Sequence, residues 1–506
     1  MSVLPFLAVT FGSAFAALLL RRWTFAATVV GLIGLAAATL AALAIGGGTL
    51  AIGGGTIGGS AYGRLFLFLG TASGFVVTLI ALGTGRPRDL PAALLAGLGA
   101  TGLAISLGDP TTAVAATIVA GSAGILISLA PGSTGRGIGV AARELRAIAV
   151  AGALVLLATS WIGRSIPALA EDPAIVGLAY VAIAIGIAMR FGAIPFHLWV
   201  ARVADAAPDV ALPLLTMWIP AGLAVVGLAW VDREILPLVQ VVGDLPLERT
   251  VVVAIGLACL VLGAIAAWIQ DDIEHVVGYA AVQDAGVVLL AIAALDPAVW
   301  TAARTWIVVL VVARTALAAW AAAIRARFGS RRIDDLSGWA RRSPVLLLGL
   351  LAIAVASIGL PGLVAFEARA TIIRSAVGGP LGTIVLVAVF LPLLYYGRLL
   401  AVGLARPTAA TAAIADDRPR RPPEALARST FRLVLAVNRG LLVGVLVLVL
   451  AVTALTTSAG GFGLTSAAAE DAPSASPGPS TGPAASPTPS PAPSPATSPA
   501  GSPAAP

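Results

Sequence analysis

Residues 190–208 read RFGAIPFHLWVARVADAAP, and this stretch decides how the fold is interpreted. It places an arginine, a proline and a histidine at the end of a long apolar run. A charged side chain inside a membrane is costly, so such residues are rare and usually line an ion or proton path. Pro195 has no N–H and leaves the carbonyl of Phe191 without its helical partner, which lipid cannot replace. The stretch therefore predicts a broken membrane helix beside a polar cavity.

The composition indicates a membrane protein. The chain has 506 residues, 59% hydrophobic and 11% charged, with a mean hydropathy of +0.99. Apolar runs of about 20 residues recur with short polar connections, and they predict an all-α polytopic membrane protein of about fourteen transmembrane helices. The net charge of +7 would suggest nucleic acid in a soluble protein. Here the arginines lie mainly in the connections, so we expect contact with the lipid bilayer and no nucleic acid.

The arginines also predict the orientation. The arginine-rich connections follow odd-numbered spans, and the positive-inside rule then assigns them to the cytoplasm: 21–22, 86–88, 136–146, 325–342 and 406–432. Both termini are therefore expected outside the cytoplasm, in a multi-pass protein of the plasma membrane. The first apolar run meets Arg21 and Arg22 instead of a small-residue cleavage site, so we expect a first span and no cleavable signal peptide.

A second apolar run, 343–376, is too long for one straight crossing. It is interrupted by Gly359, Pro361 and Gly362. Two spans broken by glycine and proline at corresponding positions are typical of transporters built from inverted repeats, with the site near the membrane midplane. The broken helices are spans seven and twelve, so we expect two inverted five-helix repeats. The alternative is that Pro195 and Pro361 only kink packed helices.

The expected organisation has six parts. In chain order these are the N-terminal helices one to three (1–89), a first repeat of helices four to eight (90–232), a second repeat of helices nine to thirteen (250–404), a basic cytoplasmic connection (405–433), helix fourteen (434–456) and a tail rich in Pro, Ser and Ala (467–506). The tail has no periodicity and nothing to bury, which predicts disorder.

Six residues are candidates for a proton path. Asp284 lies within span ten, where an isolated carboxylate is expected to be protonated or paired with a cation. The cation is one of Arg190, Arg314 and Arg369, and the sequence does not choose among them. The remaining candidates are Glu367 in span twelve and His197 near the end of span seven. Two alternatives stay open: Asp284 bonds a neighbouring helix without a role in transport, or the arginines snorkel to an interface.

Cofactor sites are not expected. The chain has one cysteine, Cys259, and two histidines, His197 and His275. This excludes a disulfide within the chain and a cysteine-ligated metal or iron–sulfur site. No glycine-rich phosphate loop follows a strand pattern. We therefore expect no cofactor and no metal.

These segments resemble the antiporter-like membrane subunits of respiratory complex I, which are related to multisubunit sodium/proton antiporters and to membrane-bound hydrogenase subunits. Four pieces carry the resemblance: 190–208, where the family shows a lysine followed by PFH, a tryptophan and Gly-Ala-Pro; 272–286, similar to its AYSSIAHxG segment; 336–370, similar to LARRSP…AGIPPLxGFxxK; and 395–398, similar to YYxR. The resemblance covers spans seven to thirteen and is greatest to the N-type subunit, which has fourteen spans.

The resemblance carries over unevenly to single residues. The family has a lysine in span seven and another in span twelve, and arginine stands at both places in this chain, as Arg190 and Arg369. The family's span-ten histidine is replaced by Asp284. Pro220 stands at the place of the span-eight lysine. The family's span-five glutamate, which pairs with the span-seven lysine, is missing. The nearest acid is Glu144, at the start of span six.

The chain contains no lysine, since all 31 basic residues are arginine. A bias toward codons for Ala, Arg, Gly and Pro explains this for surface positions. In a proton channel the exchange is not conservative, because a buried lysine can lose its proton whereas arginine stays charged.

The resemblance implies a proton-translocating membrane subunit of a complex I-like NADH:quinone oxidoreductase or a related hydrogenase complex. Its partners would be other membrane subunits, which would carry the redox chemistry, so the chain would have no redox site of its own. Two alternatives remain: a cation/proton antiporter subunit, and a degenerate scaffold subunit that does not conduct.

Overall fold

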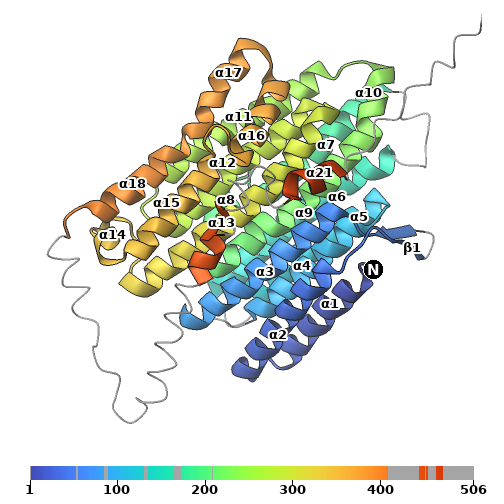
Figure 1. Ribbon diagram of the computed structural model, residues 1–506. Helices are drawn as coiled ribbons and strands as arrows, with labels where there is room; N and C mark the ends of the chain where they lie inside the picture. Colours follow the sequence, from blue (N-terminus) through green and yellow to red (C-terminus); the bar gives the residue numbers. More distant parts are fainter. Residues whose placement is uncertain are drawn as a thin grey trace, which may run out of the picture. The chain divides into compact units, whose positions relative to one another are not determined.

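The computed structural model describes residues 2–52, 55–84, 89–129, 135–162, 172–207, 209–407, 444–450, 452–453 and 463–470. The protein is a mostly helical, polytopic membrane protein, and most of its helices lie alongside one another (Figure 1). The predicted connection 405–433, helix fourteen and the tail fall largely outside the described residues.

The N-terminal part of the chain forms ten helices and one hairpin. They are α1 (Leu4–Leu19), α2 (Thr24–Leu43), β1 (Thr49–Ile52), β2 (Gly55–Gly58), α3 (Ala61–Thr84), α4 (Leu90–Ser106), α5 (Pro110–Leu129), α6 (Gly135–Trp161), α7 (Pro173–Phe191), α8 (Leu198–Ala206), α9 (Ile219–Trp230) and α10 (Leu236–Val242). A 3-10 turn (Asp209–Ala211) follows α8, and π-helical turns (Leu214–Trp218, Val231–Ile235) flank α9. The strands β1 and β2 pair antiparallel, with Thr49 opposite Gly58.

The following part is also helical. It contains α11 (Pro246–Trp268), α12 (Ile273–Ala294), α13 (Trp300–Phe328), α14 (Trp339–Arg342), α15 (Pro344–Ile358), α16 (Val364–Val377), α17 (Gly379–Val387), α18 (Pro392–Leu404) and the short α21 (Leu464–Glu470). Three 3-10 turns join these helices: Pro297–Val299, Asp334–Leu336 and Ala388–Phe390.

Within the described residues, nine helical segments are long and apolar enough to cross a membrane, or ten if the bent pair Asp334–Arg342 and Pro344–Ile358 is one span. This is fewer than the sequence predicts. One reason is length, because α1 and α4 have 16 and 17 residues and fall short of the usual crossing of about 20. Another is that the apolar run 343–376 is divided between α15 and α16. The count of fourteen stays a prediction.

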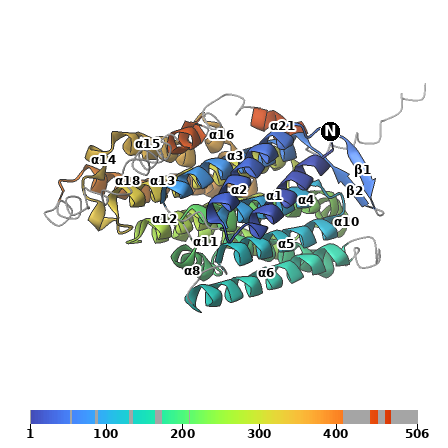
Figure 2. The same cartoon turned by 90° about the horizontal axis from the view of Figure 1, so that it is seen from below.

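Helices α12 and α13 form the centre of the bundle. α13 lies between α3 on one side and α15 and α16 on the other (Figures 1 and 2). The apolar window of α13 is 100% buried and that of α12 is 94% buried. A helix that is apolar on every face is expected to be surrounded by other helices. Asp284 on α12 and Arg304 and Arg314 on α13 are therefore held in the protein interior.

Candidate functional site

The first helix break separates α7 from α8. Gly192 ends α7 with a φ of +66°, and a Cβ there would meet the Val200 side chain at 2.2 Å. Two backbone groups at the break find side-chain partners: the indole N–H of Trp199 donates to the Met189 carbonyl at 3.0 Å, and the Ile194 N–H donates to the Cys259 sulfur at 3.1 Å. The helix thus ends before Pro195, which is exposed, and protein side chains bind part of the broken backbone.

The second break separates α15 from α16. Gly359 and Gly362 have φ of +63° and +88°, a region that glycine adopts without steric cost. A Cβ on Gly359 would lie 2.7 Å from the Phe366 nitrogen, so a larger residue would not fit. Pro361 is exposed between the two glycines. Glu367 is exposed as well, and its Oε1 accepts a hydrogen bond from the Gly362 N–H at 3.2 Å. Glu367 therefore binds the backbone of the break at the surface of the chain.

A buried ion pair joins α6 and α7. Arg190, at the end of α7, donates from Nη1 to Glu144 Oε1 at 2.7 Å, and the two side chains are 6% and 2% exposed. Its partner is thus Glu144 and not Asp284. The sequence indicated Glu144 only as the nearest acid, because the pairing depends on how α6 packs against α7. We call Arg190 and Glu144 the α6–α7 pair.

A second buried group lies on α12 and α13. Arg314 Nε donates to Asp284 Oδ2 at 2.5 Å, with side chains 1% and 4% exposed. Arg314 also donates to the hydroxyls of Tyr396 and Tyr395, at 3.2 and 3.3 Å. Tyr396 in turn donates to Ser357 Oγ at 3.0 Å. Of the three candidate cations, Arg314 is thus the one that pairs with Asp284.

Arg369 lies beside these residues without a carboxylate of its own. It is fully buried, its guanidinium lies 4.7 Å from the centre of the Trp306 ring, and its Nε donates to the Ala365 carbonyl at 3.4 Å. Among the described residues its Nη2 has no hydrogen-bond partner. Asp284 is close enough to attract it electrostatically. Two arginines therefore share one carboxylate.

We call this group the α12–α13 cluster; its members are Asp284, Arg314, Arg369, Tyr395 and Tyr396. The two tyrosines lie on α18 and were not among the predicted site residues, although their adjacent positions in a span were a usable signal. The sixth candidate, His197, is half-buried, and its ring centroid lies 6.1 Å from that of Tyr279. In the described part of the chain, its buried Nδ1 has no hydrogen-bond partner.

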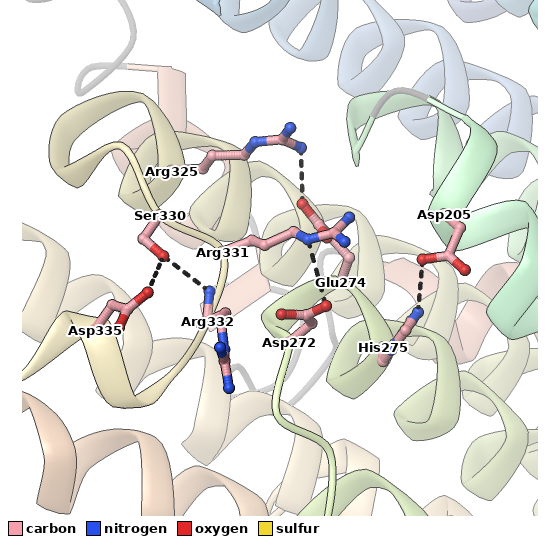
Figure 3. A network of polar contacts seen from close by, with 9 residues as sticks. All are labelled: Asp205, Asp272, Glu274, His275, Arg325, Ser330, Arg331, Arg332 and Asp335. Carbon is pink, nitrogen blue, oxygen red and sulfur yellow. Dashed lines mark hydrogen bonds and ion pairs between the residues drawn. The ribbon is translucent and has the colours of Figure 1, made fainter. Parts of the chain in front are cut away.

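A third polar group lies at the beginning of α12 and is partly open to solvent (Figure 3). Glu274 Oε1 binds Arg325 at 2.7 Å, and its Oε2 binds Arg331 at 3.5 Å. His275 Nε2 lies 3.2 Å from Asp205 Oδ1 on α8. This group fastens the start of α12 to the end of α13 and to α8. The described segments contain no cluster of three or more His, Cys, Asp or Glu side chains that could hold a metal ion.

Residues 162–394 match the family model described as NADH:quinone oxidoreductase/Mrp antiporter, transmembrane, and they contain both helix breaks and the three charged members of the α12–α13 cluster, Asp284, Arg314 and Arg369. This part of the chain is similar to that family. Glu144 lies outside the matched residues, so the α6–α7 pair joins Arg190, inside the match, to a residue beyond it.

The chain spans about half the length of the curated relatives it matches. NADH-quinone oxidoreductase subunit N of Laribacter hongkongensis is 28% identical over 243 residues, which are 47% of this chain and 49% of that protein. Subunit N of Maricaulis maris is 30% identical over 231 residues, 45% of this chain and 46% of that protein.

Two solved structures share the fold over most of this chain. A chain of respiratory complex I from Thermus thermophilus with bound aureothin has a TM-score of 0.66 at 18% identity, covering 89% of this chain and 97% of that one. A chain of the Mrp complex from Dietzia sp. has a TM-score of 0.69 at 18% identity, covering 92% of this chain and 51% of that one. The fold that these chains share therefore extends beyond residues 162–394.

Proposed function

We propose that this chain is a proton-translocating membrane subunit of a complex I-like NADH:quinone oxidoreductase or a related hydrogenase complex. The observation that carries the proposal is the α12–α13 cluster: a carboxylate and two arginines buried between helices of the family-matched segment. Buried charges inside a membrane are expensive and are usually retained for ion or proton movement. The partners would be other membrane subunits, and those would carry the redox chemistry.

Asp284 would be the group that gains and loses a proton. Arginine keeps its proton at all accessible pH values, so Arg190, Arg314 and Arg369 act as fixed positive charges. When Asp284 is ionised, Arg314 stabilises its charge through the hydrogen bond between them. When Asp284 is neutral, the two positively charged arginines favour the release of its proton. His197, at the junction of α7 and α8, and Glu367, at the surface by the second break, would serve as entry or exit positions.

The test is Asp284→Asn, which keeps the shape of the side chain and removes its ability to ionise. Proton uptake would be measured in membrane vesicles that contain the assembled complex, as a rate per assembled chain. We expect the rate to fall at least about tenfold, because a positioned acid–base group typically contributes about a hundredfold or more to a rate. Asp272 precedes α12, and its Oδ2 lies 3.3 Å from Arg331 Nε in the partly solvent-open polar group there. Asp272→Asn is the matched control and should pump normally. Normal uptake by Asp284→Asn would remove the proton-carrying role.

A non-conducting scaffold is the second candidate. One observation favours it: Arg314 already binds Asp284 and both tyrosines, so the only acid of the cluster is held in a fixed ion pair. Unchanged uptake in both Asp284→Asn and Arg190→Ala, with normal assembly, would support the scaffold. A cation/proton antiporter subunit would instead show uptake that depends on added sodium.

We also propose fourteen spans, two inverted repeats at 90–232 and 250–404, and both termini outside the cytoplasm. The support is the distribution of arginines between the spans and the two breaks at corresponding places. Reporter fusions at residue 335 and near residue 480 should lie on opposite sides of the membrane. Reporters on the same side would contradict both the orientation and the span count.

A further inference from the structure

The acid that faces Arg190 comes from an unexpected helix. Helix α5 also approaches this arginine, but it contains no acidic residue. Beside the guanidinium it carries Gly121, where a Cβ would lie 3.0 Å from Arg190 Nη2. The bare backbone of α5 therefore lets the guanidinium lie against it, and the carboxylate is supplied by Glu144 on α6 instead.

Glu144 uses only one of its two carboxylate oxygens. Oε1 accepts the hydrogen bond from Arg190, whereas the buried Oε2 has no partner within the part of the chain that the structure describes. Glu274 is equally buried, yet both of its oxygens are bound, one by Arg325 and the other by Arg331 (Figure 3). A buried carboxylate oxygen without a donor is unfavourable while it carries charge, and a proton on that oxygen relieves the cost.

A small cavity lies next to Arg190. Its volume is about 10 Å³, close to the space that one water molecule needs. Arg190 and Thr117 give it two polar sides, and apolar residues of α5, α6 and α9 line the rest. A water molecule there would lie beside the arginine of the α6–α7 pair.

We infer that Glu144 is a second proton-carrying carboxylate. It would gain and lose a proton beside the fixed positive charge of Arg190, as Asp284 does beside Arg314. The inference rests on the proposed function. In the loading step a proton binds Oε2, and the pair changes from neutral to singly positive. In the release step the same proton passes to water, and the charge-assisted hydrogen bond to Arg190 is restored. Arg190 keeps its proton throughout.

The first test is Glu144→Gln, measured as proton uptake per assembled chain. The amide keeps an acceptor for Arg190 but cannot ionise, so uptake should fall at least about tenfold. Glu274→Gln is the matched control, because it also replaces a buried, arginine-bound glutamate, and it should stay within about twofold of wild type. If Glu144→Gln pumps normally while Asp284→Asn does not, only this inference fails. If both pump normally, the proposed function fails as well.

A second readout does not depend on pumping. Infrared difference spectra of the purified wild-type assembly, recorded between acidic and alkaline pH, should contain carboxyl bands from groups that change protonation. Glu144→Gln should remove one of these bands and leave the band that Asp284→Asn removes. Spectra of Glu144→Gln that match the wild type would overturn the inference, because Glu144 would then not change its protonation.

Discussion

The α6–α7 pair and the α12–α13 cluster place buried charge in the same protein in two different ways. In the pair, one arginine meets one carboxylate, and a carboxylate oxygen remains without a partner in the described chain. In the cluster, two arginines share one carboxylate, and tyrosine hydroxyls and the Trp306 ring surround the excess positive charge. A buried arginine can thus be stabilised in two ways, by a carboxylate or by oriented dipoles and the face of an aromatic ring.

The largest expected effect concerns the shared carboxylate. Asp284→Asn deprives two buried arginines of their counter-charge, whereas Glu144→Gln deprives one. Breaking a buried ion pair costs about 3–5 kcal/mol, so both variants should be less stable, and Asp284→Asn should be the worse of the two. Thermal unfolding of the purified assembly in detergent would measure this. An equal or smaller loss for Asp284→Asn would mean that Arg369 does not depend on Asp284.

A smaller effect distinguishes the two arginines of the cluster. Arg369→Met removes a buried charge that has no carboxylate of its own, and methionine can still pack on Trp306. The lost cation–π attraction of about 0.5–2 kcal/mol is offset because a charge no longer has to be buried, so we expect little change in stability. Arg314→Met is the comparison variant, and it should lose about 3 kcal/mol or more. Equal losses would show that both arginines pair with Asp284.

The smallest effect concerns the tyrosine hydroxyls. Tyr396→Phe removes a hydroxyl that accepts from Arg314 and donates to Ser357, which should cost about 1 kcal/mol. Tyr180→Phe is the control, because that hydroxyl makes one long hydrogen bond of 3.4 Å to the Ile292 carbonyl. The unfolding midpoints of the two variants would be compared. A larger loss for Tyr180→Phe would contradict the role given to the hydroxyls around Arg314.

Part of the site could be predicted from residue types alone. Glycine and proline inside apolar runs mark the two places where α7 and α15 end, because the chain there has a φ that glycine favours. A further sequence signal was available for Glu367 and Arg369. Residues two apart on a helix do not face the same side, and the structure exposes Glu367 while it buries Arg369.

The amino-acid sequence is enough to predict a multi-spanning membrane protein, since apolar runs long enough to cross a bilayer recur with short polar connections. It also determined which charges are costly, because their depth in a span follows from counting residues. The ion pairs that these charged side chains form follow from the tertiary structure and not from the sequence. Glu144 and Arg190 are 46 residues apart, and Asp284 and Arg314 are 30 apart. Their pairing depends on which faces of α6, α7, α12 and α13 pack together. When a helix is apolar on nearly every side, its sequence does not show which side faces the protein interior.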